Sequence, residues 1–195
     1  IMNIGSMGYL PQVFKKIENE KKLNIVYLGG SITMGCNATK TELRYVDRSA
    51  KWWQTNFPEA EISYFNAGIG ATTSQFGVAR VQEHVLDKQP DLVFVEFSVN
   101  DSSSPLFMET YESLVRRLLK AESVKAVVLI NNLFYDTGTN AQGIHNAIGL
   151  HYDLPIVSVR NYIFPEIQLG NVCLADYTAD MLHPTDLGHK MIADL

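Results

Sequence analysis

One serine, one asparagine and one Asp-x-x-His pair are the side chains of this sequence that could carry out acyl transfer together. Ser31 follows two glycines, Asn100 follows an apolar run, and Asp180 lies three residues before His183. A serine becomes a nucleophile near neutral pH when a histidine accepts its proton, and a carboxylate on the other imidazole nitrogen orients that histidine. These residue types therefore predict a hydrolase that works through an acyl-serine intermediate.

Ser31 lies where a strand is expected to give way to a helix. Gly29 and Gly30 let the backbone turn sharply out of the strand, and the free N–H groups of a helix that begins near Ser31 would favour an oxyanion. The alternative is that Ser31 only caps that helix. The segment differs from the G-x-S-x-G nucleophile elbow, because Thr33 stands where the last glycine would be.

Two further segments offer candidate donors for an oxyanion. The glycine-containing loop of residues 66–74 runs into a helix start, and it matches neither a P-loop nor a G-x-G-x-x-G phosphate cradle. Asn100 could hold its side-chain amide over the site, as the donors of oxyanion holes do. The alternative for Asn100 is an Asx-turn that closes the preceding strand.

The C-terminal motif has two chemical interpretations. An aspartate three residues before a histidine can hold the Nδ1–H of the imidazole and leave Nε2 free to take a proton, and Pro184 keeps His183 extended. Four residues here are also potential metal ligands: Asp180, His183, Asp186 and His189. They straddle a loop–helix junction with no other cluster to complete a site, so we expect no metal. His189 is expected to pack or to cap.

Alternating apolar and amphipathic segments predict a single α/β domain over residues 1–195. Strands are expected at residues 23–28, 61–65, 91–97, 125–130 and 155–159, and helices at 46–57, 73–86, 106–122, 140–152 and 186–195. This alternation is typical of βαβ units, and it predicts a three-layer α/β/α sandwich with a mostly parallel five-stranded sheet. The ligand site of such a sheet lies beyond the carboxyl ends of its strands, where Ser31 and Asn100 fall.

In chain order, these motifs resemble the conserved blocks of the SGNH (GDSL-type) hydrolase superfamily, from about residue 10 to residue 195. Residues 29–33, Gly-Gly-Ser-Ile-Thr, resemble the first block in a variant in which Gly30 replaces the more familiar aspartate. Residues 66–74 resemble the second block, residues 99–101 the third, and residues 180–184 the fifth. The resemblance implies the flavodoxin-like SGNH fold.

The resemblance also implies a role for each candidate residue. Ser31 would be the nucleophile, His183 the general base and Asp180 the partner that orients it. The oxyanion donors would be the backbone N–H of Ser31, a backbone N–H of the second block and the side chain of Asn100.

The donor of the second block depends on how the loop is aligned. It is either Gly70 or Ala71, and Ala71 is preferred because residues 73–75 then fall in step with the family. A backbone donor survives the change from glycine to alanine, provided that the local φ accommodates a Cβ.

The Gly-Gly-Ser-Ile-Thr variant resembles members that remove acetyl groups from carbohydrates, so a sugar O-acetyl ester is the expected substrate and no cofactor is expected. The same superfamily includes lipases and thioesterases. Two alternatives come from other classes: a metal-dependent hydrolase and a non-catalytic carbohydrate-binding domain.

Composition excludes several other classes. Of the 195 residues 46% are hydrophobic and 19% charged, as in ordinary globular proteins, and the formal net charge of −5 without a basic cluster argues against a nucleic-acid partner. No apolar run approaches the roughly 18 residues of a membrane span. Cys36 and Cys173 make no disulfide framework.

The start resembles no signal peptide, so residues 1–8 are interpreted as an upstream or added remnant and the cytoplasm is slightly favoured. The oligomeric state stays open, and a longer natural chain is expected beyond Leu195.

Three other features have ordinary explanations. Trp52 and Trp53 could line a sugar subsite, but one of such a pair more often packs in the core while the other covers it. His84, His145 and His151 are expected to be structural or solvent-facing. Glu96, which ends an apolar strand, has no role that the sequence reveals.

Overall fold

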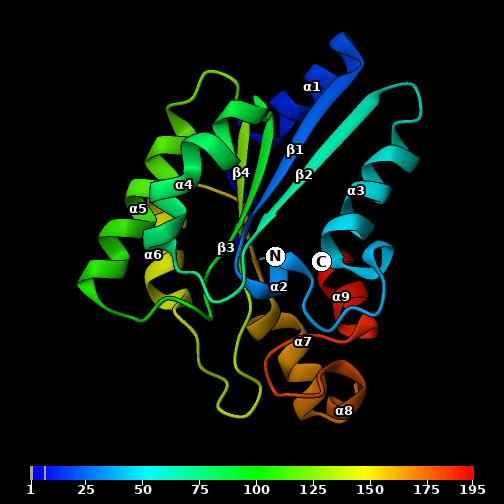
Figure 1. The fold of residues 1–195 in the computed structure, drawn as a ribbon, viewed down its shortest axis with the longest axis vertical. Helices are drawn as coiled ribbons and strands as arrows, with labels where there is room; N and C mark the ends of the chain where they lie inside the picture. The colour runs from blue at the N-terminus through cyan, green and yellow to red at the C-terminus, as the bar shows by residue number, and fades with distance from the viewer. Residues whose placement is uncertain (1, 7) are drawn as a thin grey trace.

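Five strands form one parallel sheet in the order β2-β1-β3-β4-β5 (Figure 1). In the computed structural model, which describes residues 2–6 and 8–195, the strands are β1 (Lys22–Gly29), β2 (Glu61–Gly68), β3 (Leu92–Glu96), β4 (Ala126–Asn131) and β5 (Ile156–Ser158). Every neighbouring pair of strands is parallel. The expected five-stranded α/β fold is confirmed, and the sheet is wholly rather than mostly parallel.

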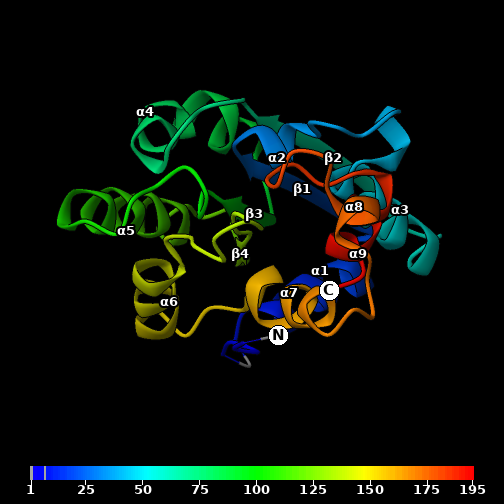
Figure 2. The same cartoon turned by 90° about the horizontal axis from the view of Figure 1, so that it is seen from below.

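Helices cover both faces of this sheet (Figure 2). One face carries α1 (Leu10–Glu20), α3 (Tyr45–Asn56), α7 (Val159–Gln168) and α9 (Asp186–Ala193), and the other carries α4 (Ser74–His84), α5 (Pro105–Leu119) and α6 (Gln142–His151). Shorter helices lie in the connections: α2 (Ser31–Met34), η1 (Thr41–Leu43), η2 (Leu86–Lys88) and α8 (Leu174–Tyr177). No helix within the described residues is long and apolar enough to cross a membrane.

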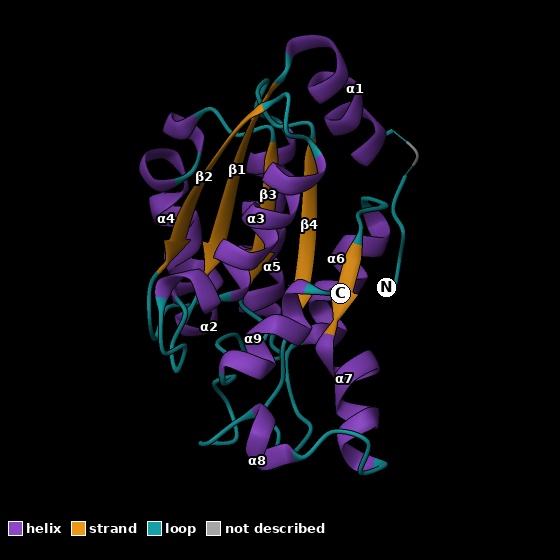
Figure 3. Cartoon of the chain, turned by 90° about the vertical axis from the view of Figure 1, so that its right-hand side faces the viewer, coloured by secondary structure: helices purple, strands orange, loops and turns teal. Residues whose placement is uncertain are grey.

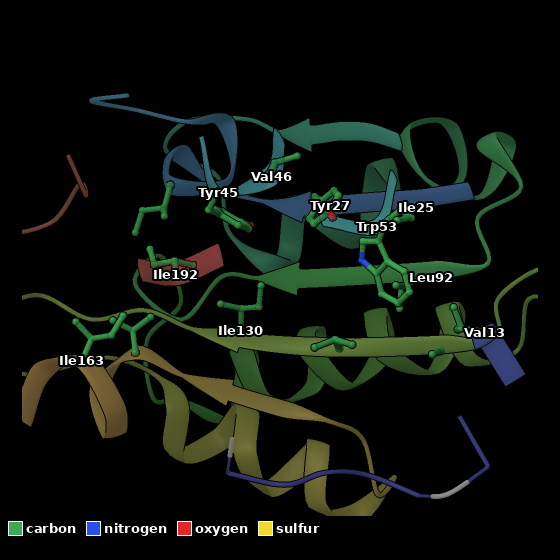
Figure 4. Close-up of a cluster of buried hydrophobic side chains, with 14 of the residues drawn as sticks. Val13, Ile25, Tyr27, Tyr45, Val46, Trp53, Leu92, Ile130, Ile163 and Ile192 are labelled. Carbon is green, nitrogen blue, oxygen red and sulfur yellow. The ribbon is translucent and has the colours of Figure 1, made fainter. Parts of the chain in front are cut away.

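The apolar run of β1 supplies both cores because successive side chains of a strand point to opposite faces. Ile25 and Tyr27 pack into the cluster under α1, α3 and α9. Val26 and Leu28 pack into the cluster under α4, α5 and α6. Figure 4 shows the first cluster, in which Trp53 of α3 lies over the sheet. Burial on both faces explains why the strands are continuously apolar rather than alternating.

Helix α5 follows from its sequence pattern. It begins at Pro105, a residue suited to the first helical position because it has no N–H to leave unsatisfied. Its apolar residues recur every three or four positions, so that Tyr111, Leu114, Val115 and Leu118 are all buried against the sheet.

Apart from the short helices of the connections, α1 and α7 were absent from the expected set. In α1 the apolar residues Leu10, Val13, Phe14 and Ile17 recur at helical spacing, so its pattern was present in the sequence but was not among the expected helices. Helix α7 starts directly after β5, where the Oγ of Ser158 accepts a hydrogen bond from the backbone N–H of Asn161 at 3.2 Å. Val159, expected to end a strand, therefore begins a helix.

Residues 2–6 run along the outer edge of β5. The backbone N–H of Met2 donates to the carbonyl of Ile156 at 2.8 Å, and Asn3 forms an isolated antiparallel bridge with the same residue. The N–H of Ser6 donates to the carbonyl of Asp153 at 2.7 Å. The supposed N-terminal remnant thus covers an open sheet edge. Ile1 and Met7, which belong to the same segment, lie outside the described residues.

Replacing Leu114 by alanine should lower the free energy of unfolding by about 2–5 kcal/mol, because the side chain is fully buried and its loss leaves a cavity. The control is Leu106→Ala on the same helix, where the leucine is 53% exposed and the change should stay within about 0.5 kcal/mol. Urea denaturation measures both. Equal stabilities of the two variants would contradict this placement of the core.

Candidate active site

The carboxyl ends of the parallel strands gather the segments in which the sequence predicts chemistry (Figure 3). Strand β1 leads into Ser31, β2 into the turn of residues 69–73, and β3 into the turn that holds Asn100. The loop before α9 reaches the same edge, where His183 contacts Ser31 across a separation of 152 residues. The site is therefore built from both ends of the chain.

Ser31 is the first residue of α2 and is half-buried. Its Oγ lies 2.8 Å from Nε2 of His183, within hydrogen-bond distance. The capping interpretation is wrong, because Gly30 occupies the N-cap position. Ser31 thus stands where backbone N–H groups of a helix start are unpaired.

Asp180 holds the other side of the His183 ring. Its Oδ2 lies 2.7 Å from Nδ1 of His183, and its Oδ1 accepts the backbone N–H of His183 at 2.7 Å and that of Leu182 at 3.1 Å. Desolvation raises the pKa of Asp180, but these hydrogen bonds outweigh it and hold that pKa well below its usual range. Asp180 is therefore an anion at any pH near neutrality. It favours the tautomer of His183 that carries its proton on Nδ1 and accepts at Nε2.

The curl of this loop depends on residues that the motif does not name. Met181 adopts φ +64°, which lets the chain fold back between Asp180 and His183. The hydroxyl of Thr178 donates to the carbonyl of His183 at 2.8 Å. The side-chain amide of Asn37, a residue with no sequence signal for the site, donates to Oδ2 of Asp180 at 3.2 Å.

Asn100 lies against the peptide that precedes Ser31. A Cβ placed on Gly30 would collide with Oδ1 of Asn100, so a larger residue at this position would require the side chain of Asn100 to shift. The backbone N–H of Asn100 donates to the carbonyl of Phe97 at 3.0 Å, which forms a tight turn at the end of β3. The Asx-turn interpretation is wrong, because Oδ1 of Asn100 has no hydrogen-bond partner among the described residues and lies against Gly30, next to Ser31.

The turn of Gly70 and Ala71 lies on another side of Ser31. A Cβ placed on Gly70 would lie 3.9 Å from the Cβ of Ser31. Ala71 has φ +57°, a left-handed conformation that costs a residue with a Cβ about 1–2 kcal/mol and glycine nothing. The backbone at residue 71 therefore accommodates the Cβ of alanine only with strain, and its conformation favours glycine.

The four candidate metal ligands do not converge. The carboxylate of Asp186 accepts from the N–H and the hydroxyl of Thr39, at 2.8 and 2.6 Å, and these bonds lower its pKa. His189 is buried, which lowers its pKa, and its Nε2 donates to the carbonyl of Cys36 at 3.0 Å. No group of three such side chains within the described residues is placed to hold a metal ion. Asp186 and His189 instead attach α9 to the chain after α2, so the packing role expected for His189 is confirmed.

The tryptophan pair serves the core, as expected. Trp53 is 6% exposed, and Trp52 is 52% exposed and packs edge-on against it at 5.1 Å between ring centroids. Both line a cavity of about 820 Å³ between α1, α3, α9 and the sheet. Neither Ser31 nor His183 lines this cavity, so the pair lies apart from the candidate site.

Glu96 is a fully buried carboxyl group beneath the Ser31 segment. The hydroxyl of Thr33 donates to its Oε2 at 3.3 Å, and the same hydroxyl lies 2.8 Å from the phenol oxygen of Tyr45. Burial raises the pKa of Glu96 to about 7, although hydrogen bonds from Asn132 and Thr33 oppose the shift. The only sequence signal for this group is an acidic residue in an otherwise apolar strand.

This pKa predicts a pH-dependent stability. Between about pH 4.5, the ordinary pKa of glutamate, and pH 7, folded Glu96 holds a proton that the unfolded chain releases, so stability falls as pH rises through this window. The expected loss is about 3 kcal/mol. Urea denaturation of Glu96→Gln at pH 5 and pH 8 should show a smaller difference than the wild type shows. Glu59→Gln, at an exposed position, is the control, and the same pH slope in Glu96→Gln and wild type would contradict the assignment.

Comparison with known proteins places this geometry in a family context. The model of the GDSL-like lipase/acylhydrolase family matches residues 27–191. The acetylxylan esterase of Geobacillus stearothermophilus is 25% identical over 91% of this chain and 93% of its own length. A crystal structure of that esterase superimposes with a TM-score of 0.73 at 20% identity, covering 88% of this chain and 91% of that one, which supports the fold.

A more similar structure is a two-domain esterase active on acetylated mannans, which was co-crystallised with mannopentaose. It is 47% identical to this chain and has a TM-score of 0.96 over 98% of it. The present chain covers 52% of that protein, and so spans about half of its length.

Proposed function

Because the chain belongs to the GDSL-like lipase/acylhydrolase family, we propose that it is a serine esterase that removes acetyl groups from a mannan-type polysaccharide. The observation that carries the proposal is the continuous relay from Ser31 through His183 to Asp180, with contacts of 2.8 and 2.7 Å. Such a relay makes a serine nucleophilic near neutral pH without a cofactor.

In the proposed reaction, Nε2 of His183 takes the proton of Ser31 while Oγ attacks the acetyl carbonyl carbon. The tetrahedral intermediate collapses as His183 gives that proton to the departing sugar oxygen, which leaves an acetyl-serine. Water then attacks this ester with His183 again as base, and acetate is released. Asp180 stays ionised throughout and stabilises the imidazolium that forms in each step.

Three donors are proposed for the negative charge on the carbonyl oxygen. The N–H of Ser31 lies at the start of α2, where it has no partner within the helix. The side chain of Asn100 supplies a second donor, and the N–H of Ala71 a third. The left-handed φ of Ala71 supports its alignment with the family's glycine and therefore favours it over Gly70.

The polymeric substrate is proposed from two observations. The mannan esterase is more similar in sequence to this chain than the acetylxylan esterase is. The rim of the site is also open, because Met34 beside Ser31 and Met181 beside His183 are 43% and 40% exposed. An acetyl group that projects from a long chain can reach a nucleophile placed at such a rim.

Ser31→Ala should reduce acetate release from acetylated mannan by at least about 10³-fold, because the nucleophile is lost. EDTA should leave the wild-type rate unchanged, since no metal takes part in the proposed steps. Ser63→Ala, an exposed serine of β2, is the control. Activity that is indifferent to Ser31 would overturn the mechanism, and faster release from acetylated xylan than from acetylated mannan would overturn the substrate.

Asn100→Ala should lower kcat by about 10²–10³-fold and leave KM nearly unchanged, because an oxyanion donor acts mainly in the transition state. Steady-state kinetics with p-nitrophenyl acetate measures the two constants. An unchanged kcat would remove Asn100 from the oxyanion hole.

A further inference from the structure

A second Asp–His pair lies buried behind the candidate site. Oδ2 of Asp101 is 3.0 Å from Nε2 of His145, and both side chains are fully inaccessible to solvent. Asp101 directly follows Asn100 in the turn after β3, whereas His145 belongs to α6 on the far side of that turn. The proposed mechanism uses neither residue.

The carboxylate of Asp101 joins two separate segments. Its Oδ1 accepts the backbone N–H of Ser74, the first residue of α4, at 2.9 Å. Its own backbone N–H donates to the carbonyl of Phe97 at 3.0 Å, in the turn that also fixes Asn100. One side chain therefore ties the turn that bears Asn100 to the helix start that follows Ala71.

His145 completes the support of this carboxylate. Its ring stacks on Tyr111 with centroids 3.6 Å apart and planes 6° apart, so the ring orientation is fixed. Nδ1 of His145 has no hydrogen-bond partner among the described residues, which assigns the ring proton to Nε2, the atom that faces Asp101. Burial lowers the pKa of His145 and keeps the ring neutral. Asp101 thus receives two N–H donors, one from each side.

We propose that Asp101 and His145 are positioning residues. They fix Asn100 relative to the turn of residues 70–71, and these two supply the proposed oxyanion donors other than the N–H of Ser31. This inference rests on the proposed esterase function. A buried carboxylate is costly, and an apolar pair of similar volume could pack the same space at lower cost. What the carboxylate supplies is a fixed geometry, and oxyanion donors depend on geometry because a displacement of about 1 Å can cost roughly 10²-fold in rate.

A matched pair of substitutions tests the link. His145→Asn places its amide near the position of Nδ1, away from Asp101, whereas His145→Gln can place its amide near Nε2 and keep the donor. We expect His145→Asn to lower kcat for p-nitrophenyl acetate by about 10–100-fold with KM within about twofold, and His145→Gln to stay within about threefold of wild type. If His145→Asn does not fold, His145→Leu, which also lacks a donor, replaces it with the same expectation.

Two controls separate positioning from general destabilisation. Ile148→Ala loosens the same helix at a buried position without touching Asp101, and it should lower Tm while kcat stays within about twofold. In the Asn100→Ala background, His145→Asn should lower kcat by a smaller factor than it does in the wild type, because only the turn of residues 70–71 then remains to be positioned and residues that act through one another are not additive.

Each outcome has a defined meaning. Wild-type kcat in His145→Asn, equal losses in the asparagine and glutamine variants, or full additivity with Asn100→Ala would overturn the positioning role while Ser31-dependent activity stands. A wild-type protein without Ser31-dependent hydrolysis would overturn the proposed function, and this inference with it.

Discussion

The direction of the strands is the constraint on which the rest of the molecule depends. In a parallel sheet all carboxyl ends lie at one edge, so segments far apart in the sequence meet there without any long loop. Ser31, Asn100 and the 69–73 turn each follow a different strand and reach that edge by default. Only the loop of Asp180 and His183 arrives otherwise, and it is held by the attachment of α9 to the chain that leaves α2. The proposed catalytic relay forms where the loop of His183 contacts Ser31.

Three carboxyl groups lie in or under the site, and the protein treats each one differently. Asp180 is partly exposed and receives several N–H donors, so it is ionised and can balance a positive imidazole. Asp101 is inaccessible to solvent, and its two oxygens are satisfied by a helix start and a neutral histidine. Glu96 is equally inaccessible but has weaker support, and burial raises its pKa. Desolvation raises the pKa of both Asp180 and Glu96, and the hydrogen bonds around Asp180 outweigh that effect whereas those around Glu96 do not.

Backbone strain is found on two sides of Ser31. Ala71 and Met181 both adopt positive φ, a conformation that residues with a Cβ rarely take. At Met181 the turn lets Asp180 accept from the backbone and the ring of His183 at once. At Ala71 the turn follows Ile69, whose N–H donates to the carbonyl of Gly29 at 3.1 Å and so attaches it to the Ser31 segment. In both places the surrounding hydrogen bonds maintain a strained residue next to the proposed chemistry.

The sequence by itself determined the class of the fold, its five strands and the residue types of the relay, because apolar periodicity and the Asp-x-x-His spacing act locally along the chain. Two helices were not predicted: α1, although its apolar residues recur at helical spacing, and α7, which begins at Val159 directly after β5, where the strand was expected to continue. The tertiary structure alone decided whether Ser31 meets His183, that Asn37 supports Asp180, and that Asp186 and His189 bind other partners than a metal. It also distinguished His145, which is buried against Asp101, from His84 and His151, because the sequence did not indicate which of these histidines makes a buried contact. These outcomes depend on distances between residues far apart in the chain, and packing of the helices on the sheet sets those distances.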